Sequence, residues 1–141
     1  MKRKASAIWR GDLKGGKGSI STDSGVLKDT QYSFSTRFEN GVGTNPEELI
    51  AAAHAGCFSM AFSAELGKAG LTPESIQTTA TITMEKTDAG FTVTESQLDM
   101  KAKIPGADKA KANEIANAAK AGCPISRLLN AKITLNANLE T

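Results

Sequence analysis

Apolar and polar residues alternate along several stretches of the chain, which predicts strands there. The clearest stretch covers 76–85, and the turn residues at 88–90 lead into a return strand over 91–104. Within the return strand the apolar residues change parity between Val93 and Leu98, which predicts a β-bulge. A last alternating stretch over 133–139 predicts one more strand.

The first forty residues are typical of short strands and turns. We expect strands over Lys4–Trp9 and Ser19–Thr22 around the glycine-rich turn Lys14–Gly18, and a third strand over Tyr32–Phe38 before a loop at 40–43. The turn lacks the Gly-Lys-Ser/Thr ending and the following helix of a phosphate-binding loop. It therefore predicts a hairpin connection.

A strong helix start follows at residues 45–48, which supply a capping asparagine, a proline suited to the first helical position and a glutamate at the third. We expect this helix to run to about Leu66. Sixteen of its residues, Leu49 to Ala64, carry no charged side chain. They are too few and too polar to cross a bilayer, so the helix is expected to be surrounded by protein.

Two shorter helices are expected between the return strand and the last strand. Asp108 can cap one that runs to about Ala121, and Pro124 begins another over Ile125–Asn130. The expected order of elements predicts an α+β fold rather than a regular βαβ alternation: several strands, one long helix, a pair of strands, two helices and a last strand. Because no repeat or linker interrupts the chain, we expect one domain over 1–141.

Composition and charge narrow the class of protein. The chain has 141 residues and a net charge of +2, which does not favour a nucleic acid or an anionic membrane surface as its partner. Basic residues at 2–4 are not followed by an apolar run, so we expect a cytoplasmic, reducing location. Two cysteines are too few for a disulfide scaffold or a zinc ribbon, but a pair suffices for thiol chemistry.

The two cysteines have different local settings. Cys57 lies within the uncharged helix, where a free cysteine is often a buried and unreactive hydrophobic residue, and a reactive thiolate there would need a cation from elsewhere in the chain. Cys123 lies between Gly122, which ends one helix, and Pro124, which begins the next, so it occupies a capping position that favours a thiolate. It can equally be a simple connector, and the sequence spacing does not say whether the two cysteines pair.

A metal site is the rival interpretation of this pair. His54 precedes Cys57 by three residues, so both side chains can face the same way on the helix. It is the single histidine of the chain, so any fourth ligand would have to be a carboxylate or a solvent molecule. Structural zinc sites favour a full set of cysteines and histidines, and we therefore expect no metal.

Five segments, taken in order, resemble the OsmC/Ohr family. They are Ile8–Asp12, Ser35–Glu39, Thr44–Leu49, Ala52–Ala61 and Ala121–Ser126. The arginine in the second segment favours the OsmC branch (osmotically inducible protein C). The resemblance implies an OsmC-like fold with antiparallel sheets around long central helices, in an intertwined homodimer with two active sites at the subunit interface.

The resemblance also implies an activity, that of a cysteine-based peroxidase that reduces organic hydroperoxides, and hydrogen peroxide less well. Cys57 would be the peroxidatic cysteine and Cys123 the resolving one, while Arg37 would activate the thiolate and Glu47 would hold the arginine. No bound cofactor is implied. A Cys57 sulfenic acid would become a Cys57–Cys123 disulfide, which an external dithiol such as dihydrolipoamide or a lipoylated protein would reduce. The candidate walls of an apolar substrate pocket are Phe58, Met60 and Phe62.

Glu47 precedes Cys57 by ten residues, which is about 15 Å along a straight helix, so it cannot contact the Cys57 of its own chain. We therefore predict that Arg37 and Glu47 serve Cys57 of the partner subunit. Glu48 is expected to supply only a favourable charge in the first helical turn, and His54 is given no catalytic role. A second hypothesis is a non-catalytic module that binds a lipid or acyl ligand in the same apolar interface pocket.

Overall fold

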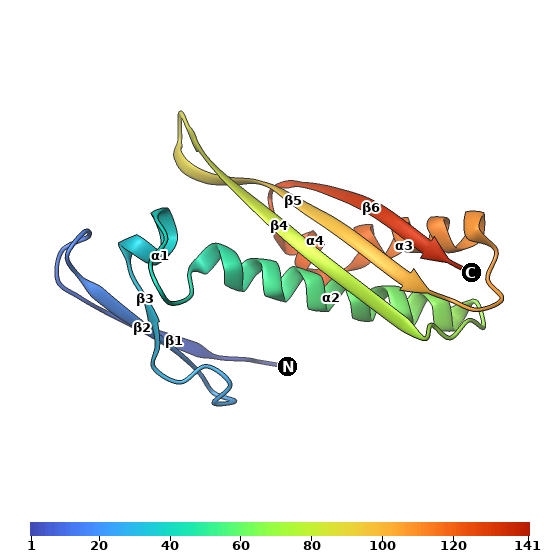
Figure 1. Ribbon diagram of the computed structural model, residues 1–141, viewed down its shortest axis with the longest axis horizontal. Helices are drawn as coiled ribbons and strands as arrows, with labels where there is room; N and C mark the ends of the chain where they lie inside the picture. The colour runs from blue at the N-terminus through green and yellow to red at the C-terminus, as the bar shows by residue number, and fades with distance from the viewer. The chain divides into compact units, whose positions relative to one another are not determined.

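Ten helices and strands follow one another in the computed structural model, which describes residues 1–141 (Figure 1). They group into two units, Met1–Leu49 and Ile50–Thr141, which are described separately. Each unit contains one three-stranded sheet. The predicted α+β class is confirmed, whereas the grouping of the whole chain as one domain stays a prediction.

The sheet of the first unit consists of β1 (Ala5–Arg10), β2 (Lys17–Thr22) and β3 (Thr30–Tyr32), in that order and antiparallel throughout. β1 and β2 pair from Ala5 opposite Thr22 to Arg10 opposite Lys17. The glycine-rich segment between them is therefore the turn of a hairpin, as predicted.

The strand predicted over Tyr32–Phe38 is wrong beyond its first residue. The chain forms a short helix there, α1 (Phe34–Phe38), because Ser33 and Thr36 make a reciprocal capping box. The Ser33 hydroxyl accepts from the Thr36 backbone N–H at 3.2 Å, and the Ser33 N–H donates to the Thr36 hydroxyl at 2.8 Å. Local side-chain hydrogen bonds here outweigh the β propensity of the aromatic and threonine residues.

The loop after α1 passes close to the backbone of β3. Gly43 has φ +141°, and a side chain there would collide with the carbonyl oxygen of Gln31, so only glycine suits this position. The next backbone N–H, that of Thr44, donates to the same oxygen at 2.9 Å. Asn45 accepts from the Glu48 N–H at 2.8 Å, which confirms the predicted helix start.

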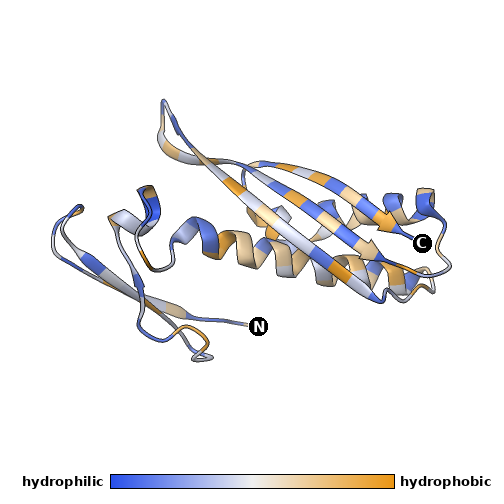
Figure 2. Cartoon of the chain, in the orientation of Figure 1, coloured by the Kyte–Doolittle hydropathy of each residue, from blue (hydrophilic) through white to orange (hydrophobic).

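Helix α2 (Pro46–Lys68) is longer than expected, and only one stripe of it is buried by the chain itself. The buried residues follow a four-residue spacing: His54, Phe58, Phe62 and Leu66. The expectation that protein surrounds this helix is therefore wrong for the single chain, because many of its uncharged side chains remain exposed, Met60 among them. Figure 2 shows the apolar to weakly polar colouring of most of α2. The expectation that this helix is too short and too polar to cross a bilayer does not hold for its full length, because by length and composition alone the 23-residue α2 would suffice to cross a membrane; core helices of soluble proteins also meet this measure.

The second sheet contains β4 (Ser75–Thr87), β5 (Gly90–Lys103) and β6 (Lys132–Glu140), with β5 in the centre. β4 and β5 form an antiparallel hairpin whose register shifts because Thr83 faces Glu95 while Met84 faces Val93. The extra residue, Thr94, is the predicted bulge, and it explains why the apolar residues of β5 change parity.

β6 runs parallel to β5, so the expectation of wholly antiparallel sheets is wrong for this strand. A parallel pair requires a long crossover connection, and α3 (Lys109–Gly122) and α4 (Pro124–Leu128) supply it. Asp108 caps α3 through its carboxylate, which accepts from the Lys111 N–H at 3.0 Å.

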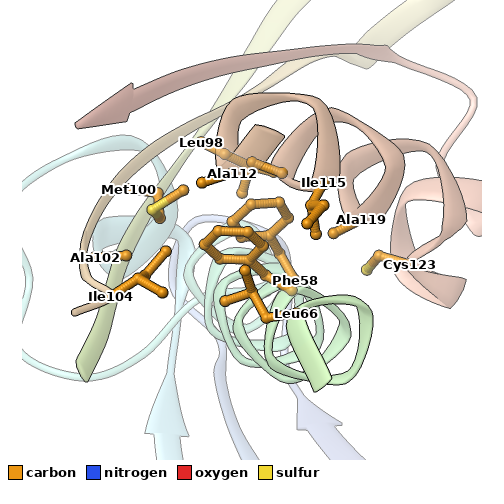
Figure 3. Packing of buried hydrophobic residues seen from close by; sticks show 12 residues of the cluster. Phe58, Leu66, Leu98, Met100, Ala102, Ile104, Ala112, Ile115, Ala119 and Cys123 are labelled. Carbon is orange, nitrogen blue, oxygen red and sulfur yellow. The ribbon is translucent and has the colours of Figure 1, made fainter. Parts of the chain in front are cut away.

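A single apolar core holds α2, α3 and the β4–β5–β6 sheet together (Figure 3). Phe58 and Phe62 stack with their ring centroids 6.1 Å apart, and each is fully buried. Burial of such a side chain contributes about 1.5–3 kcal/mol. Figure 3 shows Cys123 at the edge of this cluster, next to Ala119 of α3. The core therefore fixes the end of α3 against the middle of α2.

Candidate active site

The two thiols meet in the second unit. Cys57 of α2 and Cys123 of the α3–α4 junction are free cysteines, and their sulfur atoms are 2.7 Å apart. Cys123 is fully buried, whereas Cys57 is partly exposed. The tertiary fold thus answers the question that sequence spacing left open, because it brings both sulfurs within reach of one another.

Cys57 receives opposing electrostatic influences. Burial raises the pKa of the Cys57 thiol, and the neighbouring Cys123 thiol raises it further. The backbone N–H of Ile125, at the start of α4, donates to Cys57 and opposes this rise. Within its own unit Cys57 is therefore a protonated thiol at neutral pH, which agrees with the expectation that it needs a cation from elsewhere.

Cys123 occupies the predicted capping position, but its side chain makes no capping hydrogen bond there. It is both the C-cap of α3 and the N-cap of α4, and its side chain accepts no hydrogen bond from the backbone of α4. The Ile125 N–H is directed instead to Cys57. The start of α4 consequently favours the thiolate of Cys57, a contact that sequence reasoning missed because it depends on α4 folding back onto α2.

Arg37 and Glu47 form an ion pair in the first unit. Arg37 Nη2 lies 2.7 Å from Glu47 Oε1, and Arg37 Nε donates to both carboxylate oxygens at 3.1 and 3.2 Å. The guanidinium also lies 5.4 Å from the centre of the Phe38 ring. A side-on pair of this kind fixes the plane of the guanidinium, which makes Arg37 a directed donor rather than a mobile charge.

Glu48 has a structural role in the same helix start. Its backbone N–H bonds to Asn45, and its carboxylate accepts from the Thr44 hydroxyl at 2.7 Å. These contacts agree with the expectation that Glu48 serves the first turn of α2.

A cavity of about 280 Å³ lies beside Arg37 within the first unit. It is lined by four of the chain's seven aromatic side chains, together with Leu13 and Pro46; these aromatic residues are Trp9, Tyr32, Phe34 and Phe38. Trp9 and Tyr32 lie with ring centroids 5.5 Å apart, and Phe34 and Phe38 with centroids 4.8 Å apart. Sequence reasoning missed this cavity, although the concentration of aromatic residues before position 40 was a usable signal.

The three residues predicted to line a substrate pocket are not brought together. Phe58 and Phe62 are fully buried in the core of the second unit, and Met60 is 76% exposed on another face of α2. Because side chains two residues apart on a helix point in different directions, the three cannot form one wall. Phe58 and Phe62 leave no surface for a substrate within this chain.

His54 bonds to serines on two other elements. It is fully buried, with Nδ1 2.6 Å from the Ser96 hydroxyl of β5 and Nε2 2.7 Å from the Ser126 hydroxyl of α4. Burial lowers the pKa of His54, so the ring is neutral at neutral pH. Both ring nitrogens bond to serine hydroxyls, and no group of three His, Cys, Asp or Glu side chains is placed to hold a metal ion.

Comparisons with known proteins point to one family. Residues 38–138 match the OsmC family, described as OsmC-like protein. The chain is 53% identical over 139 residues to Peroxiredoxin OsmC of Escherichia coli (strain K12), which covers 99% of this chain and 97% of that protein.

More distant relatives share the fold. Organic hydroperoxide resistance protein OhrB of Bacillus subtilis is 29% identical over 129 residues, covering 90% of this chain and 93% of the relative. Its crystal structure superposes with a TM-score of 0.69 at 25% identity, over 97% of this chain and 98% of that one. An OsmC-like protein from Mycoplasma pneumoniae gives a TM-score of 0.78 at 16% identity, over 100% and 99% of the two chains.

Proposed function

Because the chain belongs to the OsmC family, we propose that it is a peroxidase that reduces organic hydroperoxides through Cys57 and Cys123. One observation carries the proposal: the two free thiols lie 2.7 Å apart, and one of them is partly open to solvent. A pair of thiols in this arrangement can reduce a peroxide and store the two oxidising equivalents as a disulfide.

The proposed reaction has three steps: oxidation of Cys57, formation of the disulfide, and reduction of the disulfide. The Cys57 thiolate attacks the distal oxygen of the hydroperoxide, the O–O bond breaks, and the alkoxide takes a proton to leave as an alcohol, with a sulfenic acid left on Cys57. The Cys123 thiol then displaces water from this sulfenic acid to form the disulfide. An external dithiol, of the dihydrolipoamide or lipoylated-protein class, reduces the disulfide and is itself oxidised to a disulfide.

Arg37 activates the thiolate in this proposal. A guanidinium keeps its charge at any relevant pH and can stabilise the thiolate while it donates to the peroxide oxygens. Glu47, ten helical residues or about 15 Å before Cys57, is too far along α2 to act on its own chain. We therefore assign the Arg37–Glu47 pair to Cys57 of the partner subunit in a homodimer. The open apolar faces of α2 support such an interface.

The aromatic cavity beside Arg37 takes the place of the pocket predicted from α2. Its walls are apolar, and the charge of Arg37 is balanced by Glu47, so the cavity favours an uncharged organic group. A volume of about 280 Å³ accepts a group much larger than hydrogen peroxide. The proposal therefore assigns bulky alkyl or aryl hydroperoxides as substrates and hydrogen peroxide as a poorer one.

Stopped-flow reduction of cumene hydroperoxide tests the roles of the two cysteines. We expect Cys57→Ser to abolish peroxide consumption, because it removes the attacking sulfur. Cys123→Ser is expected to consume one equivalent of peroxide per subunit and to stop at the sulfenic acid, since no resolving thiol remains.

The same measurements separate this proposal from the alternative of a non-catalytic lipid-binding module. If both variants consumed peroxide at the wild-type rate, or if the wild type consumed none, the peroxidase assignment would be abandoned. Tight binding of a fatty acid by a wild-type protein without peroxidase activity would favour the alternative.

A further inference from the structure

Helix α4 and its cap supply two groups that contact Cys57. Apart from Ile125, which packs partly buried against the apolar core, little of the helix itself holds it in place. It has only five residues, and none of them is fully buried. Helices this short are marginal on their own and depend on tertiary contacts. Its N-terminal cap is Cys123 and its second residue, Ile125, donates a backbone N–H to Cys57. The core holds Cys123 at the end of α3, and the position of α4 controls the Ile125 contact and the orientation of Cys123 as the residue that begins α4.

The buried imidazole of His54 connects α4 to the rest of the second unit. His54 lies one helical turn before Cys57 on α2, and it reaches Ser126 of α4 at 2.7 Å and Ser96 of β5 at 2.6 Å. A neutral imidazole has one donor and one acceptor nitrogen, and a hydroxyl can complement either, so both bonds are satisfied in either tautomer. Because His54 and Ser96 are fully buried, water cannot easily replace these bonds.

We infer that His54 is a positioning residue: with Ser96 as its anchor, it holds Ser126 so that Cys123 and the Ile125 N–H stay on Cys57. The imidazole touches neither sulfur through any of its hydrogen bonds, so its effect passes through α4. A role of His54 in catalysis rests on the proposed function, whereas its effect on the distance between the two thiols does not.

Exchange with glutathione measures how well the two thiols are held together. The protein dithiol reacts with oxidised glutathione to give the protein disulfide and two molecules of reduced glutathione, and the equilibrium gives the effective concentration of one thiol relative to the other. We expect Ser126→Ala to lower this effective concentration about three- to tenfold, the range for one lost hydrogen bond. Ser126→Thr keeps the hydroxyl and should retain the wild-type value.

Ser59→Ala is the matched control. Ser59 is partly buried, as Ser126 is, and lies on α2, as His54 does, but its hydroxyl bonds to Thr78 of β4 at 2.8 Å and not to α4. Its loss removes one oxygen atom and one link between elements, as Ser126→Ala does. We expect the effective concentration in Ser59→Ala to stay within about twofold of the wild type, because the lost bond joins α2 to β4 and leaves α4 in place.

A second readout follows the Ile125 contact. In a Cys123→Ser background, Ser126→Ala should raise the pH at which iodoacetamide alkylates Cys57, because the thiolate loses part of its N–H donor. Ser59→Ala should leave this pH unchanged. His54→Gln is measured in the same way, so that the result does not depend on one variant that fails to fold.

Equal effective concentrations in Ser126→Ala, His54→Gln and the wild type would overturn the inference, and so would equal losses in Ser126→Ala and Ser59→Ala. These outcomes are independent of peroxidase activity, because glutathione exchange requires no peroxide. A protein that fails the cumene hydroperoxide assay but shows the Ser126 effect would refute the proposed function and keep the positioning role.

Discussion

Cys57 is held in a state that its own unit cannot activate. Burial and the adjacent Cys123 raise the pKa of its thiol, and one backbone N–H from Ile125 does not outweigh them. A thiol with a raised pKa is mostly protonated at neutral pH and reacts slowly with peroxides. In the proposed function this deficit makes reactivity depend on Arg37, so the thiol is activated only where the guanidinium reaches it.

The pH dependence of Cys57 alkylation tests this at the residue scale. In a Cys123→Ser background, Arg37→Ala is expected to shift the rise in iodoacetamide reactivity to higher pH, because the thiolate loses its stabilising cation. The thiolate is the reacting species, and its fraction increases as the pH passes upward through the pKa of the thiol. Arg10→Ala, which removes an arginine of the same unit, is the control and should leave the profile unchanged. Coincident profiles for all three proteins would contradict the activating role.

Single elements show where local and long-range forces disagree. The alternating pattern of β4 and β5 and the caps of α2 and α3 agree with their tertiary contacts, so these elements and the bulge at Thr94 were predictable. Phe34–Phe38 has the composition of a strand but forms α1, because the Ser33–Thr36 capping box satisfies the first turn of a helix. Arg37 thereby lies in the last turn of α1, where it meets Glu47.

The capping box gives a prediction at the scale of this element. Ser33→Ala is expected to destabilise the first unit by about 1 kcal/mol, because α1 loses the oxygen that accepts its backbone N–H. Urea unfolding followed by the fluorescence of Trp9, the single tryptophan of the chain, reports on this unit. Ser35→Ala, in the same helix but outside the capping box, is the control and should have a smaller effect. Equal shifts in the two urea midpoints would show that the cap does not hold α1.

At the scale of the whole molecule, the ion pair and the thiol pair belong to different units. Arg37 and Glu47 pair within Met1–Leu49, and Cys57 and Cys123 within Ile50–Thr141. α2 presents uncharged side chains that its own chain leaves open, Met60 among them. Exposed apolar surface of this kind favours association with another protein surface. A homodimer that brings the arginine of one chain to the thiol of the other would account for both features.

Subunit complementation tests that arrangement directly. Arg37→Ala and Cys57→Ser subunits, each inactive alone, are mixed under conditions that allow exchange. If Arg37 serves the partner subunit, each mixed dimer regains one complete site, and a statistical mixture recovers about a quarter of the wild-type activity. If Arg37 serves its own chain, every site in the mixture lacks one of the two residues and activity stays at the level of the separate variants. That second result would refute the assignment in trans.

The sequence by itself determined the α+β class, most helix and strand positions, and the loop and caps that begin α2, and it supplied the candidate residues for the proposed chemistry. These features depend on the local pattern of apolar and polar residues and on short motifs, both of which can be read directly from the sequence. Only the tertiary structure decided that Cys123 meets Cys57 at 2.7 Å, that β6 runs parallel to β5, and that His54 ties α4 to β5. Such contacts join residues far apart in the chain, and their formation depends on how the crossover packs on the sheet. The aromatic cavity and the burial of Phe58 and Phe62 were decided in the same way, because the direction in which a helical side chain points depends on which face of the helix the core covers.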